Sequence, residues 1–471
     1  MHKNKITIIG AGSIVFCSTL LNDIFNTAAL DGFEIALMSP TLSKIERMKN
    51  YADKIIAQNN LTSTVYATTD RRHALKDAKY VILLFQVGGV EAFGVDYKIP
   101  MKYDVDQCIG DSMGPGGVFR LLRSVTLMRE IDQDMQELCP HAYVLNYVNP
   151  MGAICTYLGR YTQMKYVGLC HGVQTTMDLI AGYTGAPKDE IDFTAAGINH
   201  MAWFLELSHK GRDLYPILRE NMEKPEYFIN EKVRGEVMRQ CGYFMTESTG
   251  HLSEYLPWFR KNSDALSEYC NMPDFGGATG AYYKYSKSIA AKYASEDVFA
   301  LESGKLDPRS KEYCSYVLEA LETGVPFKLN GNVLNKGYIQ NLPDDACVEV
   351  PMFVDKMGLH PTVVGALPPH LAAMNQSNIT VQSMAADGAY NACPEQVFWA
   401  IAMDPLTSAV LTLRETRDMV ADMFEAQAQW LPDFAGKKLA RTPWIPIPYG
   451  IVPADVPVDP ALAINSRFGK L

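Results

Sequence analysis

The feature that most constrains the fold is a regular alternation of short apolar runs with helical patterns in the first third of the chain. The apolar runs are continuous rather than spaced every second residue, and they lie at 5–12, 33–39, 63–69, 78–86 and 142–150. Helical patterns occupy the segments between them, from about Ser18, over 41–58 and over 124–140. Continuous apolar strands separated by helices are typical of a parallel sheet buried on both faces. We therefore predict an α/β fold that begins with a Rossmann-like, doubly wound parallel sheet.

The alternation fades after about residue 195, where longer helices and a polar stretch from 305 to 350 follow. A chain of 471 residues is too long for one simple core, so a second region is expected. We predict a dinucleotide-binding domain over 1–195. A mixed α/β domain over 196–471 is expected to pack over the sheet edge and to supply substrate and oligomer contacts.

Charge and cysteine usage exclude several classes of protein. The net charge of −10 argues against a nucleic-acid partner or an anionic membrane surface, because either would need clustered Lys and Arg. The apolar run near the start is too short and glycine-rich to span a membrane, and no signal-peptide cleavage site follows it, so a cytoplasmic protein is expected. The 10 cysteines form no CxxC pair, which indicates neither a zinc ribbon nor a disulfide framework.

A glycine turn directly after the first apolar run predicts dinucleotide binding. Gly10 allows a tight turn, Gly12 allows the backbone to approach a pyrophosphate, and Ser13 adds a hydroxyl at the start of the next helix. The third glycine of the GxGxxG pattern is absent, because Val15 occupies its position. The position of the turn at the head of an α/β alternation nevertheless favours a nicotinamide dinucleotide.

The choice between NAD and NADP stays open at this point. The second strand ends in Ser39, where an acidic residue usually binds the ribose hydroxyls. Ser39 can hydrogen-bond a ribose hydroxyl, whereas Lys44 or Arg47 can lie near a 2′-phosphate. Both basic residues can equally well be solvated helix residues.

A cysteine and two histidines stand in two short motifs near the middle of the chain. Cys170 and His171 follow an apolar run in "GLCHGV", and His200 stands in "AGINH". From the residue types alone, a buried apolar thiol and a satisfied core imidazole are the favoured interpretation of Cys170 and His200.

Two further segments place polar groups where a ligand is expected. "CIGDSMGPGGVFRLLR", residues 108–123, is glycine-rich without being a Walker loop, and it carries Asp111; a turn followed by an exposed basic helix face is the simpler interpretation. "NYVNP" puts Asn146 and Asn149 at a strand's carboxyl edge, which is where open α/β sheets bind ligands.

Taken together, these motifs resemble glycoside hydrolase family 4, the NAD-dependent glycosidases. The resemblance runs nearly end to end, through "GAGS", "IGDSMGPGGVFRLLR", "NYVNPM", "GLCHGV", "AGINHMAWFLEL", "GYFMTES", "HLSEYLPWF" and "GALPPHLAAMNQSNI". This family is an exception to two-carboxylate glycosidase chemistry. The resemblance implies NAD as cofactor and a divalent metal, usually Mn²⁺, bound by Cys170 and His200.

The resemblance also implies the reaction. NAD accepts a hydride from C3 of the sugar, and the resulting ketone acidifies the proton at C2. The metal chelates the C2 and C3 oxygens, a base removes that proton, and the C1 substituent leaves by elimination. Water then adds and the hydride returns, so the cofactor is regenerated in each turnover.

Family roles can be carried over to individual residues. His171 is a candidate general acid for the departing oxygen, or a group that only hydrogen-bonds the sugar ring. The C2 base is expected among Tyr255, Glu247 and His251, with Tyr255 and Glu247 ranked equally. Asp111 and Asn149 resemble sugar-binding groups, and Asn146 is expected on the nicotinamide side; the two asparagines can instead simply cap the strand's end.

The motifs also bear on the substrate. Phospho-glycosidases of the family resemble CDxP or CNxP where this chain has "CHGV", so a 6-phospho sugar is not expected. The α-galactosidase branch, with CHSV, matches the flanking text, which predicts an α-galactosidase acting on an α-glycoside. The alternatives are an α-galacturonidase, an α-glucuronidase or an α-glucosidase of the same family.

Two alternatives come from other classes, namely a simple 2-hydroxy acid dehydrogenase and a catalytically dead NAD-binding sensor. The resemblance further implies a homodimer or homotetramer.

Overall fold

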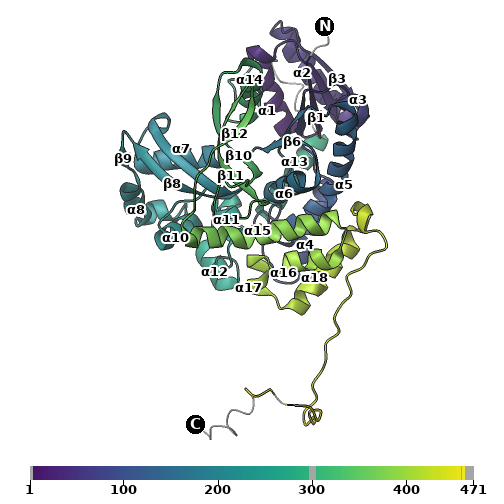
Figure 1. The fold of residues 1–471 in the computed structure, drawn as a ribbon, viewed down its shortest axis with the longest axis vertical. Coiled ribbons are helices and arrows are strands. Elements are labelled where there is room, and N and C mark those ends of the chain that lie inside the picture. The colour runs from purple at the N-terminus through teal and green to yellow at the C-terminus, as the bar shows by residue number, and fades with distance from the viewer. Residues whose placement is uncertain (1–3, 296–303, 458, 462–471) are drawn as a thin grey trace. The chain divides into compact units, whose positions relative to one another are not determined.

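The first half of the chain forms a parallel sheet, as the apolar runs predict. The computed structural model describes residues 4–295, 304–457 and 459–461, and Figure 1 shows its helices and strands. The strands follow the order β3-β2-β1-β4-β5-β6, and each neighbouring pair is parallel. Their bounds are β1 (Lys5–Ile9), β2 (Glu34–Met38), β3 (Thr64–Thr68), β4 (Tyr80–Leu83), β5 (Tyr143–Asn146) and β6 (Lys165–Gly168).

Both faces of this sheet are buried, which explains why its strands read as continuous apolar runs. Ile8 of β1 belongs to the core shared with helices α1 (Ile14–Phe25), α2 (Leu42–Gln58) and α14 (Tyr313–Thr323). Ile9, its neighbour in the strand, belongs to the core on the other side. That core includes α3 (Arg71–Leu75), α5 (Gly114–Leu138), α6 (Met151–Tyr161), α15 (Pro369–Tyr390), α16 (Pro394–Ala402) and α18 (Leu413–Gln427).

The second half extends the same sheet beyond β6. The added strands follow the order β10-β11-β7-β8-β9, and β12 pairs with β11, so the sheet has 12 strands. Their bounds are β7 (Ile191–Ile198), β8 (Met201–His209), β9 (Arg212–Asp213), β10 (Phe327–Leu334), β11 (Cys347–Asp355) and β12 (Gly358–Pro361). Asn332 of β10 lies opposite Gly168 at the end of β6, and Glu349 of β11 lies opposite Gly197 near the end of β7. This register brings the segment after β6 close to the β7–β8 turn.

The other helices surround this frame. They are α4 (Gly89–Met101), α7 (Gly172–Thr184), α8 (Tyr215–Met222), α9 (Pro225–Phe228), α10 (Lys232–Cys241), α11 (Thr249–Tyr255), α12 (Ser263–Tyr269), α13 (Ala281–Ser295) and α17 (Pro405–Val410). None of the helices in the described part of the chain is long and apolar enough to cross a membrane.

The predicted fold class is confirmed, but two helix starts were misplaced. α1 begins at Ile14 rather than near Ser18, directly after the glycine turn. α5 begins at Gly114 and not near Ser124, because the second half of the glycine-rich segment is helical. A Cβ at Gly116 would lie 2.4 Å from the carbonyl oxygen of Gly110, so these glycines serve close packing of the helix on its own loop.

The interpretation of the start of α5 as an exposed basic face is wrong. Arg120 and Arg123 are only 7% and 1% exposed. Each is paired with a buried carboxylate, Arg120 with Asp111 at 3.3 Å and Arg123 with Asp96 at 2.6 Å. Burial with a charged partner is the usual condition under which an arginine leaves water.

Residues 1–440 form one compact unit, and 441–471 form a second one. The division into domains at residue 195 stays a prediction.

Candidate active site

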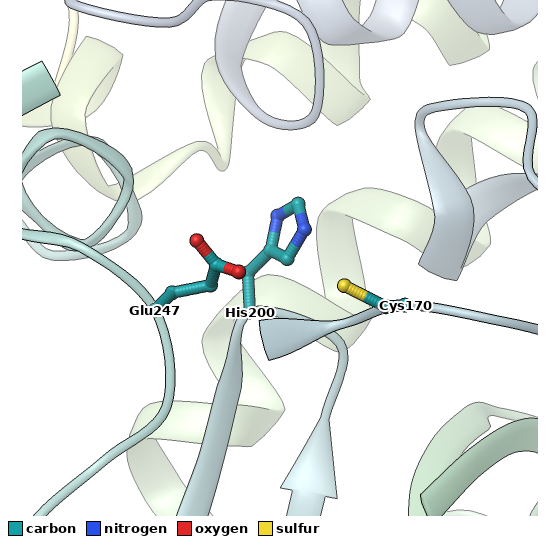
Figure 2. A group of neighbouring side chains, drawn as sticks. All are labelled: Cys170, His200 and Glu247. Atoms are coloured by element: carbon teal, nitrogen blue, oxygen red, sulfur yellow. The ribbon is translucent and has the colours of Figure 1, made fainter. Parts of the chain in front are cut away.

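Three side chains that are distant in sequence converge on one point (Figure 2). Cys170 follows β6, His200 lies in the turn between β7 and β8, and Glu247 lies in the loop before α11. One ligand atom from each, a sulfur, a ring nitrogen and a carboxylate oxygen, lies within 4.8 Å of the others. The structure thus brings together the two predicted metal ligands, and it adds Glu247 to them.

Two members of this group have an unusual backbone. His200 has a φ of +64° and Glu247 a φ of +75°, in the left-handed region that non-glycine residues rarely adopt. Such a conformation costs about 1–3 kcal/mol and persists only where the surroundings enforce it, as at many functional sites. Here the backbone N–H of Thr246 donates to the carbonyl oxygen of Ala202 at 2.8 Å, which attaches the Glu247 loop to β8.

Burial and neighbouring charges shift the pKa values of these three side chains, and the shifts bear on their ability to bind a cation. Burial lowers the pKa of His200 to about 4, so its imidazole is neutral near pH 7 and keeps a lone pair. Burial alone would raise the pKa of Glu247, but His251, His200 and His171 outweigh it and bring the pKa to about 2. Burial raises the pKa of the Cys170 thiol well above its ordinary value, and a bound cation is what would favour the thiolate there.

The three candidates for the C2 base lie around this group. The Tyr255 hydroxyl oxygen lies 3.2 Å from Nδ1 of His200, and burial raises the pKa of Tyr255 well above its ordinary value. Nδ1 of His251 lies 3.2 Å from the Glu247 carboxylate, and its ring packs edge-on against His200. The structure therefore brings Tyr255, Glu247 and His251 together, while their roles stay predictions.

Asp111 and Asn149 also meet at the site. The Asn149 amide donates to Asp111 at 3.1 Å, and the Arg120 guanidinium donates to the same carboxylate oxygen at 3.3 Å. Burial alone would raise the pKa of Asp111, but Arg120, His251, Ser112 and His200 lower it. A fixed, ionised carboxylate beside an amide can bind sugar hydroxyls.

His171 directly follows Cys170 in the chain and is exposed to solvent. Its side chain is 54% exposed, and Nδ1 lies 3.1 Å from the carboxylate of Glu312. The hydrogen bond to Glu312 raises the pKa of His171. Sequence reasoning gave no sign of Glu312, because nothing links it to His171 along the chain.

The tight turn predicted at Gly10 is present, and its role in binding a dinucleotide stays a prediction. Gly10 has a φ of +95°, and a Cβ there would lie 2.6 Å from the backbone nitrogen of Phe85, so only glycine fits. Ser13 is the N-cap of α1 and makes no capping bond with its side chain. Asn146 is fully buried, and its amide exchanges hydrogen bonds with the backbone of Val148. It caps the end of β5, and a contact with the nicotinamide stays a prediction.

Two buried carboxylates near the site were missed. Burial raises the pKa of Glu349 to about 8; its carboxylate accepts a hydrogen bond from the Asn199 amide at 3.4 Å, and its other oxygen has no partner among the described residues. Glu254 of α11 accepts hydrogen bonds from the backbone of Ile109 and Gly110. The first had a signal in the sequence, because a glutamate interrupts the apolar run "CVEVPMFV"; the second had none.

Comparison with known proteins decides the family. Residues 5–185 match the family described as Family 4 glycosyl hydrolase, and residues 195–407 match its C-terminal domain. The chain belongs to glycosyl hydrolase family 4. The resemblance to this family, inferred from the motifs, is confirmed. The prediction of a glycosidase instead of a 2-hydroxy acid dehydrogenase is confirmed with it.

Individual relatives of this family 4 protein cover nearly all of it. It is 40% identical to an alpha-galactosidase of Rhizobium meliloti over 92% of this chain and 90% of the relative. It is also 40% identical to an alpha-galactosidase of Bacillus subtilis, over 91% and 99% of the two chains. Its fold matches that of a 6-phospho-alpha-glucosidase from gut microorganisms, solved in complex with NAD and Mn²⁺, with a TM-score of 0.76 and 18% identity over 91% and 99% of the chains.

Proposed function

We propose that this family 4 glycosidase is an α-galactosidase that uses NAD and a divalent metal, preferably Mn²⁺. The observation that carries the proposal is the convergence of Cys170, His200 and Glu247 within 4.8 Å, beside the paired Asp111 and Asn149. The two α-galactosidases at 40% identity support the sugar.

The residues fit the proposed metal. A neutral imidazole and an ionised carboxylate are both ligands in their binding form, and the thiol supplies a third donor after losing its proton. Cys170 and His200 would hold the ion, and Glu247 would complete the protein ligands while positions stay open for sugar oxygens. When bound, the metal supplies a Lewis acid that polarises sugar oxygens, and NAD supplies a reversible hydride acceptor.

The geometry favours Tyr255 as the base. If Nε2 of His200 faces the metal, the single proton of its neutral ring is on Nδ1, which then donates to the Tyr255 oxygen 3.2 Å away. A hydrogen bond donated to that oxygen favours the phenolate, which is the form that can accept a proton. Glu247 is less suited to this role, because it lies among the metal ligands.

The other residues bind and orient the sugar. Asp111 and Asn149 would hold hydroxyls, and Arg120 fixes both of them, since its Nε donates to the Asn149 carbonyl oxygen at 3.1 Å. His171 is half exposed beside Cys170 and is oriented by Glu312. In this proposal it donates a proton to the departing oxygen.

The charges at the site favour a neutral sugar over a uronide. A uronate carboxylate or a 6-phosphate needs a cation that is not already paired. Arg120 is committed to Asp111 and to the Asn149 carbonyl, and Lys311, next to Glu312, is paired with Asp178 at 2.6 Å. The pairing of both cations supports a galactoside over a galacturonide or glucuronide.

The two parts of the chain are proposed to have different roles. We infer that residues 1–195 bind the dinucleotide and that 196–471 supply substrate and oligomer contacts in a homodimer or homotetramer. A free thiol at Cys170 that must stay reduced to bind a metal suits the reducing cytoplasm.

The test compares nitrophenyl α-galactoside with the corresponding α-glucoside and α-galacturonide, each with NAD, Mn²⁺ and a thiol reductant. The expected result is α-galactoside hydrolysis that is lost in Cys170→Ser and kept in Cys393→Ser, a partly buried cysteine at the N-cap of α16. Solvent deuterium should appear at C2 of the released sugar. Activity confined to the uronide, or an undiminished Cys170→Ser enzyme, would overturn the proposal.

A further inference from the structure

The edge of the dinucleotide site at the end of β2 lacks the acidic residue that selects NAD. In Rossmann-like folds, a carboxylate at the end of the second strand hydrogen-bonds the ribose hydroxyls and repels a 2′-phosphate. Here Ser39 follows β2, and its hydroxyl lies 3.3 Å from the point where a Cβ on Gly12 would stand. Ser39 therefore lies directly against the second glycine of the turn.

A lysine lies at the same point. Cδ of Lys44 is also 3.3 Å from the Cβ position of Gly12, so the lysine stem covers this glycine. Lys44 is exposed, and no carboxylate of the described residues is within ion-pair distance of it. Glu46 is two positions further along α2, and residues so spaced lie on different sides of a helix.

The start of α2 adds a helix N-terminus to this edge. Thr41 is the N-cap and makes no capping bond with its side chain, and the first turn of the helix contains no acidic residue. The first backbone N–H groups of a helix have no partner within the helix, and they attract anions. The Ser39 hydroxyl and the stem of Lys44 thus lie together beside Gly12, at the N-terminus of α2.

We propose that this edge accepts a ribose 2′-phosphate, so that the protein binds NADP(H) as well as NAD(H). The inference rests on the proposed function in one respect, since it takes the Gly10–Gly12 turn to be the dinucleotide site. Ser39 is short and uncharged, so it leaves the phosphate unopposed, and Lys44 supplies the balancing charge.

By binding a ligand, the buried Ser39 hydroxyl would give up only one weak hydrogen bond. Ser39 is 8% exposed, and its hydroxyl accepts one long hydrogen bond, from the backbone N–H of Thr41 at 3.5 Å. A phosphate or ribose hydroxyl would give it a better partner than the protein does. In NAD(H) the same hydroxyl can bond the ribose, so both cofactors are served by one side chain.

The experiment measures binding and not turnover. NADH and NADPH are titrated into the full-length protein without metal or glycoside, and nicotinamide fluorescence and calorimetry give the two dissociation constants. The expected result is that the two constants agree within about tenfold, a difference of about 1.4 kcal/mol or less. NADPH binding should weaken more steeply with added salt, because the 2′-phosphate pair is partly exposed.

Two variants and one control sharpen the test. Ser39→Asp is expected to weaken NADPH by about 100-fold or more while NADH binds at least as well, since a carboxylate there repels the phosphate. Lys44→Gln, an exposed substitution that should not affect folding, is expected to weaken NADPH about tenfold or more and to leave NADH unchanged. Lys49→Gln on the same helix, whose lysine is paired with Asp53, should change neither.

The possible failures are distinguishable. NADH binding with NADPH more than about tenfold weaker in the unmodified protein would overturn this inference and leave the proposed function intact. An unchanged NADPH constant in Lys44→Gln would also overturn it. If neither dinucleotide binds, the proposed function fails as well.

Discussion

We expect Glu254 to hold the loop that carries Asp111 in place against the helix that carries Tyr255. Its carboxylate accepts hydrogen bonds from the backbone N–H groups of Ile109 at 2.5 Å and Gly110 at 3.0 Å, and from the Gln107 amide at 3.2 Å. Gly110 precedes Asp111, and Glu254 itself precedes Tyr255. One buried carboxylate therefore joins the loop that carries a proposed sugar ligand to the helix that carries the proposed base.

The loss of stability expected for Glu254→Gln follows from these hydrogen bonds. The glutamine oxygen can replace only one of the two carboxylate oxygens, and its NH₂ group must face a donor. In the orientation that loses less free energy, the glutamine oxygen still accepts from the Gly110 N–H and the Gln107 amide. The N–H of Ile109 then has no acceptor. A buried unsatisfied donor costs about 1–3 kcal/mol, so the free energy of unfolding should fall by about 2 kcal/mol.

The effect on activity should be larger than this loss of stability suggests. The loop can relieve the donor–donor contact by moving, and a displacement of about 1 Å at a reacting group costs about 100-fold in rate. We expect kcat/KM for nitrophenyl α-galactoside to fall by about 100-fold, mostly through kcat, because Asp111 is misplaced and not removed.

The assay combines urea unfolding with steady-state kinetics at saturating NAD and Mn²⁺. Glu268→Gln, on an exposed face of α12, is the matched control and should change neither quantity. A Glu254→Gln enzyme that loses about 2 kcal/mol of stability but keeps kcat/KM within about threefold would show that Glu254 only stabilises the fold, and the reasoning would be refuted.

Four further predictions concern other parts of the molecule. Arg123→Met should lower the free energy of unfolding in urea by about 3–5 kcal/mol, because it leaves the fully buried Asp96 without its charged partner; a loss under about 1 kcal/mol would contradict this. Gly10→Ala should abolish NADH binding in a fluorescence titration, since its Cβ would lie 2.6 Å from the backbone nitrogen of Phe85; unchanged affinity would remove the turn from the site. Burial raises the pKa of Asp404 to about 6, so the folded chain holds this proton more tightly than the unfolded chain, and the resulting stability grows as pH falls from about 7 to 4. Asp404→Asn should remove that gain, about 2–3 kcal/mol in the difference between the two unfolding profiles, and parallel profiles would disprove it. Chelation with EDTA should abolish hydrolysis and Mn²⁺ should restore it, and activity that survives exhaustive chelation would exclude a metal role for Cys170.

The parallel sheet could be predicted from the sequence because its signal is local. Each central strand is buried on both faces, so its own side chains had to be apolar in a continuous run, as in 80–83. The Gly10 turn was equally visible, since its conformation demands glycine at one position. The glycosidase family followed from motifs that stand as short, unbroken strings.

The start of α5 and the state of its arginines could not be predicted in the same way. Glycines usually interrupt helices, and only their close approach to the preceding loop explains why Gly116 lies inside one. The buried state of Arg123 depends on Asp96 of α4 and Gln427 of α18, which no local pattern links to it.

The α/β sheet and the glycine turn follow from the sequence, because a strand buried on both faces is apolar along its whole length and the turn needs glycine at one position. Cys170 and His200 were identified through motifs that resemble family 4, and no local period links them. Only the folded structure shows that Glu247 joins this pair, that Glu254 holds the Asp111 loop, and that Lys44 covers Gly12. These contacts form where strands added from the second half of the chain, or helices packed on the sheet, bring distant backbone segments to one place. Packing of this kind depends on the whole fold, so no window of the sequence contains it.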